Sequence, residues 1–409
     1  PTAYCRCQQC SNGSPQPKRK LKRSRARRPS VKAYRVGGFV RDHLLGNVRR
    51  HLGDLDAALE TDRDWVVVGS TPEQMTALGY QPVGKDFPVF LHPETHEEYA
   101  LARTERKTAP GYKGFVAHAA PDVTLEQDLA RRDLTINAMA LDESGGLIDP
   151  YQGKRDLEAG ILRHVSPAFI EDPVRILRVA RFAARFPNFK VAPETAELMR
   201  EMVRNGEADA LVPERVMQEI SRGLMETKPS QMLNVLVSCG LIDRLFAELE
   251  DLGPTSAALD RAAQRELVLP SRFAILAGAC RSSRAVSDFL GKLRVQNDAA
   301  QLARLLVELR EPLKNAETSA AIVDVLERSD AFRRPERFEW LLQAFEAAAD
   351  VSAERFRRAL RVAAEVDAGA LASMHRNDPS QIQRAVRQAR IVAVGRELQG
   401  PQTLDQLRE

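Results

Sequence analysis

Two aspartates separated by one residue form the first spacing in the chain that indicates chemistry. Asp62 and Asp64 lead directly into the β-branched run 65–68. Because side chains alternate along an extended chain, residues two apart point to the same side. Hard divalent cations such as Mg²⁺ prefer oxygen ligands and bridge them to substrate phosphates. The pair therefore predicts a Mg²⁺ site for phosphoryl chemistry at the start of a strand.

A second pair of the same spacing, Asp54 and Asp56, lies eight residues earlier. We favour Asp62 and Asp64 because a strong β run follows them directly, whereas Asp56 leads into a segment without that pattern. The stretch that separates Gly46 from Asp62 is also longer than a compact turn requires. The earlier pair therefore remains the alternative metal site.

A glycine pair upstream has the composition of an anion-binding turn. The short strand pattern 34–36 runs into Gly37-Gly38, and an amphipathic helical pattern follows. Glycines let the backbone approach a ligand closely, and the exposed N–H groups at a helix start favour anions. Arg41, one turn further on, adds a charge-assisted contact to phosphate. This turn predicts a phosphate site, with a purely structural turn as the alternative.

A row of arginines occupies one face of a predicted helix that begins near Pro173. Arg175, Arg178 and Arg181 recur at intervals of three, with Asp172 at the N-terminal end of the row. A carboxylate and a guanidinium side by side present an acceptor and donors to the edge of a base, and further arginines reach phosphates. The row predicts a nucleotide-binding helix; a solvated basic face is the alternative.

The elements that must position these residues change character along the chain. Strand patterns at 34–36, 65–68, 88–91 and 146–148 predict an α+β domain over residues 34–160. After residue 165 the strand patterns stop, and apolar residues recur at helical spacing. The clearest predicted helices cover 174–186, 194–203, 213–225, 231–245 and 300–309. We expect a helical neck at 161–245 and a helical body and tail at 246–409.

Charge separates the first residues from the rest. Residues 1–33 hold ten Lys and Arg and no Asp or Glu, so the remainder carries 50 basic against 56 acidic residues. Such a composition predicts a disordered basic arm that adds nonspecific attraction to phosphates, with a plain solvated tail as the alternative. No apolar run approaches the roughly 18 residues that span a bilayer, and five cysteines give no even disulfide framework. We expect a cytoplasmic protein without a membrane partner.

Five segments in this order resemble the class II tRNA nucleotidyltransferases, the CCA-adding enzymes of the polymerase-β-like superfamily. The resemblance covers about residues 34–245. Its motifs are Val-Gly-Gly-Phe-Val-Arg-Asp (36–42), Asp-Arg-Asp-Trp (62–65), Arg-Arg-Asp-Leu-Thr-Ile-Asn-Ala-Met-Ala (131–140), Glu-Asp-Pro-Val-Arg-Ile-Leu-Arg-Val-Ala-Arg (171–181) and Pro-Glu-Arg-Val-Met-Gln-Glu (213–219).

The resemblance implies a nucleotidyltransferase head with a mixed sheet, followed by an all-α neck, body and tail. It also implies template-independent addition of CCA to the tRNA acceptor end from CTP and ATP, by two-metal attack of the terminal 3′-hydroxyl with release of pyrophosphate. The residue roles it implies are Asp62 and Asp64 for Mg²⁺, Asp172 and Arg175 for base selection, and Gly38, Arg41, Arg132, Arg178 and Arg181 for the incoming nucleotide.

A third carboxylate is expected on a neighbouring strand. Glu98 fits this role best, but the sequence leaves open whether Glu98 or its neighbour Glu97 occupies the position. The polar stretch 104–114 is similar to the loop that helps the family switch to ATP, with a plain surface loop as the alternative.

The same motifs allow other interpretations of the function. A bacterial poly(A) polymerase shares the head and neck motifs, but its basic pair after a glycine is replaced here by Lys85-Asp86. CC-adding or A-adding enzymes share all five motifs, and a non-catalytic RNA-binding protein on the same fold is an alternative of another class. Only His375 lies beyond residue 164 and no His-Asp dipeptide occurs, so we expect no metal phosphohydrolase site in 246–409.

Overall fold

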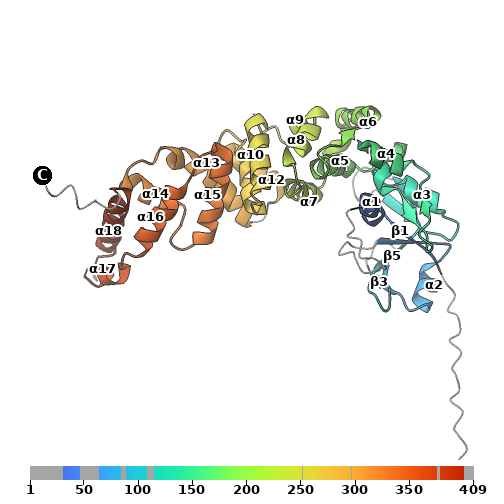
Figure 1. The fold of residues 1–409 in the computed structure, drawn as a ribbon, viewed down its shortest axis with the longest axis horizontal. Coiled ribbons are helices and arrows are strands. Elements are labelled where there is room, and N and C mark those ends of the chain that lie inside the picture. Colours follow the sequence, from blue (N-terminus) through green and yellow to red (C-terminus); the bar gives the residue numbers. More distant parts are fainter. Residues whose placement is uncertain are drawn as a thin grey trace, which may run out of the picture.

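The chain is elongated, with a sheet-containing head at one end and helices that follow one another to the other end (Figure 1). The computed structural model describes residues 31–46, 64–83, 89–107, 115–250, 252–295, 297–374 and 378–399. Asp62, the alternative pair Asp54 and Asp56, and most of the predicted basic arm lie outside the described residues. Residues 84–88, 108–114 and His375 also lie outside the described residues. They belong to the comparison with poly(A) polymerase, to the stretch 104–114 and to the expected absence of a phosphohydrolase site.

A mixed seven-stranded sheet forms the head, in the order β3-β4-β5-β2-β1-β8-β9. β2 runs parallel to β5, and the other neighbours in the sheet are antiparallel. The strands are β1 (Lys32–Val36), β2 (Asp64–Val68), β3 (Gln81–Val83), β4 (Val89–Leu91), β5 (Glu98–Leu101), β8 (Ala140–Leu141) and β9 (Leu147–Ile148). The four predicted strands are confirmed, although β1 begins two residues before the expected start at Tyr34.

Short helices and a hairpin complete the head. They are α1 (Gly38–Leu44), α2 (Pro72–Ala77), the hairpin β6 (Thr104–Lys107) and β7 (Phe115–His118), α3 (Leu125–Ala130), the 3₁₀ turn η2 (Thr135–Asn137) and α4 (Gly153–Ala159). α3 begins with a capping box: the Thr124 hydroxyl accepts from the Gln127 amide at 3.3 Å, and the Gln127 side chain accepts from the Thr124 amide at 2.9 Å. The cap fixes where α3 starts and therefore where its buried face points.

Helices dominate the chain after the head. The neck contains η3 (Pro167–Glu171), α5 (Val174–Arg185), α6 (Pro193–Arg204), η4 (Glu207–Ala210), α7 (Pro213–Leu224), α8 (Pro229–Ser238) and α9 (Leu241–Leu245). Beyond it lie α10 (Leu252–Gln264), α11 (Leu269–Ala277), α12 (Ser283–Leu293), α13 (Asn297–Asn315), α14 (Ser319–Arg328), α15 (Pro335–Ala349), α16 (Glu354–Ala364), α17 (Ala368–Met374) and α18 (Pro379–Gln399). The α+β fold class is confirmed.

Two sequence expectations for this helical part need correction. Residues 231–245 form two helices, because Gly240 adopts a left-handed conformation (φ 77°) that ends α8 and starts α9. Strands also do not stop at residue 165, since β10 (Ile161–Leu162) pairs in parallel with β11 (Lys190–Val191). This two-residue strand pair is too short to produce an alternating pattern.

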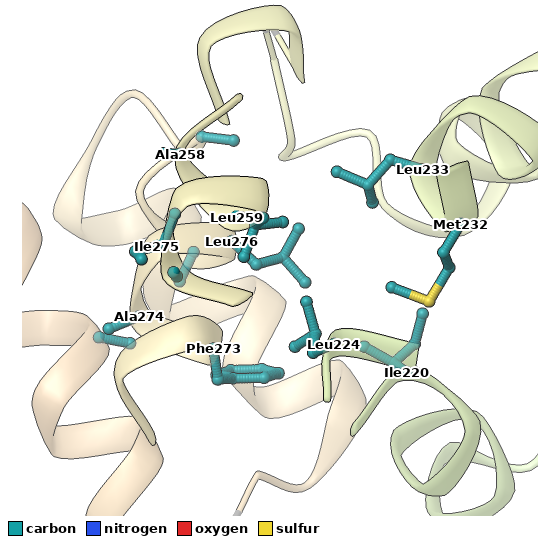
Figure 2. Close-up of a cluster of buried hydrophobic side chains, with 14 of the residues drawn as sticks. Ile220, Leu224, Met232, Leu233, Ala258, Leu259, Phe273, Ala274, Ile275 and Leu276 are labelled. Carbon is teal, nitrogen blue, oxygen red and sulfur yellow. The ribbon is translucent and has the colours of Figure 1, made fainter. Parts of the chain in front are cut away.

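One hydrophobic core runs from α1 of the head through the neck into the distal helices. Between neck and body, Ile220, Leu224 and Met232 face Leu259 and Phe273 across the junction of α7 and α8 with α10 and α11 (Figure 2). Continuous apolar packing of this kind fixes the two parts against each other. Within the described ranges, no helix has both the length and the apolar character needed to cross a bilayer.

Candidate active site

A cavity of about 830 Å³ lies between the head and the neck. Residues from the β1–α1 turn, α1, β2, η2, α5 and α7 line it, so it is assembled from segments up to about 180 positions apart. Nine of the eleven predicted site residues line it: Gly37, Gly38, Arg41, Asp64, Arg132, Asp172, Arg175, Arg178 and Arg181. Of the other two, Glu98 lies beside Asp64 and Asp62 is outside the described residues. The fold therefore gathers the three predicted motifs into one place.

The turn between β1 and α1 needs glycine at its first position. Gly37 has φ 70°, a backbone conformation that residues with a side chain rarely adopt. A Cβ atom there would lie 3.1 Å from Nη1 of Arg132 and 3.7 Å from Oδ2 of Asp64. Gly37 thus leaves room in which an arginine and a carboxylate both approach the turn.

The strand register distinguishes Glu98 from Glu97. Asp64 on β2 is the direct partner of Glu98 on the parallel strand β5, so these two side chains share a face of the sheet. Glu97 accepts a hydrogen bond from Nε1 of Trp65 at 3.2 Å, and Trp65 stacks on Tyr99 on the opposite face. Of the two glutamates, Glu98 is therefore the one on the same face as Asp64, and its role as the expected third carboxylate stays a prediction.

The described residues supply two carboxylates at this edge of the sheet. No group of three or more His, Cys, Asp or Glu suited to a metal ion occurs in the described ranges. Asp62, the other member of the Asp-x-Asp pair, lies outside these ranges. Carboxylate oxygens from adjacent strands suit Mg²⁺. Asp64 and Glu98 therefore fit the ligand chemistry of this ion.

Replacing Glu98 with glutamine tests this placement, and Glu97→Gln is its matched control. We expect E98Q to lower the rate of nucleotide incorporation by about a hundred-fold, since one charged ligand or base typically contributes two to four powers of ten. E97Q removes the same charge one residue away on the other face and should retain the wild-type rate. Single-turnover incorporation measures both; equal losses would contradict the assignment.

Arg41 is more enclosed than the sequence predicts. It is only 3% exposed, donates to both oxygens of Asp42 at 2.9 Å, and donates to Oδ1 of Asn137 at 2.6 Å. Its guanidinium also lies over the ring of Phe182 at 5.1 Å. Burial lowers the pKa of Arg41, with the nearby Asp42 carboxylate opposing that shift. Arg41 thus holds the glycine turn against the neck, although it also lines the cavity.

Two arginines of α5, Arg178 and Arg181, donate hydrogen bonds to carboxylates. Nε of Arg178 donates to Asp133 at 2.7 Å, and Nε of Arg181 donates to Glu219 at 2.7 Å. Burial alone would raise the pKa of Asp133, but the charge of Arg178 and hydrogen bonds from Asn137 and Arg178 hold it below its usual value. The side chain of Arg178 is 35% exposed and that of Arg181 10%. Arg178 is therefore the better placed of the two to reach a ligand.

Asp172 and Arg175 have different environments. Asp172 follows η3 and accepts two hydrogen bonds from Arg215 of α7, at 3.1 and 2.8 Å. Arg175 is 6% exposed and donates to the backbone carbonyls of Ala168 and Arg131, each at 2.7 Å. The geometry therefore gives Asp172 a forked guanidinium partner from α7, while Arg175 links η3, α5 and the end of α3.

Comparison with known proteins places this site in a family. Residues 33–163 match the family described as the poly A polymerase head domain, and residues 188–252 match the probable RNA- and SrmB-binding site of polymerase A. The chain is 52% identical to the CCA-adding enzyme of Bordetella bronchiseptica over 376 residues, which cover 91% of this chain and 99% of that protein. The chain belongs to the CCA-adding enzyme family.

Other CCA-adding relatives agree with this assignment. The multifunctional CCA protein of Leptothrix cholodnii is 50% identical, over 88% of this chain and 95% of that protein. Among solved structures, a CCA-adding enzyme in apo form II has a TM-score of 0.68 at 20% identity, over 92% of this chain and 90% of that one. The Thermotoga maritima CCA-adding enzyme complexed with tRNA has a TM-score of 0.63 at 20% identity, over 89% and 87%.

These comparisons confirm the family and the enzyme class that the motifs imply. The chain is a nucleotidyltransferase with the predicted head fold and a helical remainder. Nine residues that line the cavity were absent from the expected site, among them the arginines Arg103, Arg131, Arg185 and Arg215. Arg215 is the single basic residue of the motif 213–219, at the start of a predicted helix, and this position was the signal that could have identified it. Arg185 pairs with Asp42 at 3.1 Å across 143 residues, a contact that no local pattern indicates.

Proposed function

We propose that this chain builds and repairs the 3′-terminal CCA of tRNA from CTP and ATP, without a nucleic-acid template. The observation that carries the proposal is one cavity lined both by Asp64, which adjoins Glu98 at the sheet edge, and by the Asp172–Arg215 pair of the neck. The two carboxylates suit Mg²⁺, and the Asp–Arg pair suits a base. Phosphate chemistry and base choice then occur on one bound nucleotide.

Asp64 and Glu98, together with Asp62, would hold Mg²⁺ at the sheet edge. When bound, Mg²⁺ neutralises phosphate charge and lowers the pKa of the attacking hydroxyl. The chain's own contribution is positioning: Gly37 lets the triphosphate approach the backbone, and Arg132 and Arg178 offer donors to its oxygens. Little covalent chemistry remains for the protein, because alignment and charge neutralisation drive phosphoryl transfer.

Asp172 and Arg215 would read the base. Cytosine and adenine both carry an amino group, at N4 and N6, where uracil and guanine carry a carbonyl oxygen. A carboxylate accepts from an amino group and repels a carbonyl oxygen, and the guanidinium that holds Asp172 offers further donors. This pair therefore favours the two bases of the CCA sequence without distinguishing C from A on its own.

Binding of tRNA would depend on phosphates and shape at the acceptor arm, because one enzyme that serves all tRNAs reads no particular sequence. Its strength should fall steeply with salt. We place the reaction in the reducing cytoplasm; the cysteines that the structure describes, Cys239 and Cys280, are buried free thiols.

The test is extension of tRNA transcripts that end before the first C, after both Cs, or after the complete CCA. Each is incubated with the purified chain and Mg²⁺, with CTP and ATP separately and together, and the 3′ ends are sequenced. We expect addition of C, C and A and then arrest. A long A tail would instead identify a poly(A) polymerase, C-C or A alone a specialised enzyme, and no extension a non-catalytic RNA-binding protein.

A further inference from the structure

Asp128 is a fully enclosed carboxylate directly behind the cavity. It lies on α3, which the Thr124 capping box anchors, and its exposed fraction is 0%. It is not among the cavity-lining residues, whereas Arg103, Arg131 and Arg132 are. Burying a charge is costly unless partners compensate it, so the bonds that Asp128 makes indicate what it does.

The hydrogen bonds that the structure shows at the Asp128 carboxylate all come from cavity-lining residues. Its Oδ1 accepts from Nε and Nη2 of Arg131 at 3.0 and 2.7 Å, and from the backbone amide of Arg103 at 3.3 Å. Its Oδ2 accepts from Nη2 of Arg132 at 3.3 Å. Burial alone would raise its pKa, but the charges of Arg131 and Arg132 keep it below the usual value. The carboxylate is therefore ionised and shared among three positions of the site.

The bond to Arg132 fixes one end of a guanidinium whose other end reaches the glycine turn. Nη1 of Arg132 lies 3.5 Å from the carbonyl oxygen of Asn137, and 3.1 Å from where a Cβ of Gly37 would be. The bond to the Arg103 amide fixes the residue immediately before β6, the first strand of the β6–β7 hairpin. Arg131 extends the link, since its carbonyl accepts from Arg175 of the neck at 2.7 Å.

We infer that Asp128 is a positioning residue that sets the guanidinium of Arg132 against the Gly37 turn for contact with the triphosphate, and holds the start of the β6–β7 hairpin in the same arrangement. This inference rests on the proposed function, because it takes the ligand of the cavity to be a nucleoside triphosphate. Asp128 does not touch the nucleotide; it acts through Arg132.

Asp128→Asn is the first variant, because it keeps the shape and one acceptor oxygen. That oxygen continues to serve Arg131 and Arg103, while the amide NH₂ faces Arg132 and cannot accept from it. We expect the KM for CTP and for ATP to rise about ten-fold, the effect of losing one charge-assisted hydrogen bond, with a smaller change in kcat. The matched control is Asp156→Asn, which alters a buried carboxylate of the head bonded to Arg163 and Thr135, outside the cavity lining. It should retain the wild-type KM.

A double-mutant cycle with Arg132→Ala separates positioning from a general structural role. If Asp128 acts through Arg132, the double variant has the KM of Arg132→Ala alone; a KM raised by the product of the two single effects would overturn the inference. An unchanged KM in D128N would also overturn it. Should D128N fail to fold, as judged by thermal unfolding, Asp128→Ser is assayed under the same criteria. Failure of the wild-type chain to extend tRNA or to bind CTP at equilibrium would instead refute the proposed function.

Discussion

We expect Asp64→Asn to reduce nucleotide addition by about a thousand-fold, because the charge stabilisation supplied through a metal ligand is worth several kcal/mol. Asp64 starts β2, shares a face with Glu98, and lines the cavity beside the Gly37 turn. Asparagine preserves its size but removes the negative charge that Mg²⁺ requires. Single-turnover extension of a tRNA that ends after both Cs measures the loss.

Binding of tRNA should be unaffected by this change, since phosphate contacts by basic residues dominate RNA affinity. Asp122→Asn is the matched control: it removes the same charge from an exposed head residue outside the cavity lining and should be fully active. If D64N, and the double variant that also lacks Asp62, retained activity, the metal assignment would be wrong. Asp54 and Asp56 would then be the residues to replace.

The sequence predicts the components of this site better than their contacts. Alternation placed Asp64 at the start of a strand, and three-residue spacing placed Arg175, Arg178 and Arg181 on one helix, because both are local properties of the backbone. The choice between Glu97 and Glu98 required the β2–β5 register. Register depends on pairing between strands about thirty residues apart, which a single sequence does not encode locally.

The partners of the α5 arginines are the other feature that the sequence did not predict. A solvated basic face and a nucleotide-binding face have the same residue spacing, and both leave the arginines without protein partners. In the structure Arg178 and Arg181 are bonded to Asp133 and Glu219 of other elements, and Arg175 to two backbone carbonyls. Burial explains this, because a guanidinium that loses water must recover its hydrogen bonds from the protein.

Asp172→Ala should weaken the choice of base more than any other single change in the neck. We expect the kcat/KM for CTP and ATP to fall about a hundred-fold, since a hydrogen bond to a charged group contributes up to about 3 kcal/mol. UTP and GTP should lose much less, because the carboxylate that repels their carbonyl oxygens is gone. The selectivity ratio, measured with each nucleotide on the same tRNA, should therefore decrease.

The neck contains a matched control for this variant. Asp209 accepts two hydrogen bonds from Arg244 in the same forked arrangement, but that pair is on the surface and does not line the cavity. Asp209→Ala should leave both the rate and the selectivity unchanged. A selectivity ratio that stayed at the wild-type value in Asp172→Ala would place base choice elsewhere in the cavity. A loss shared equally by all four nucleotides would mean that the Asp172–Arg215 pair only holds α5 and α7 together.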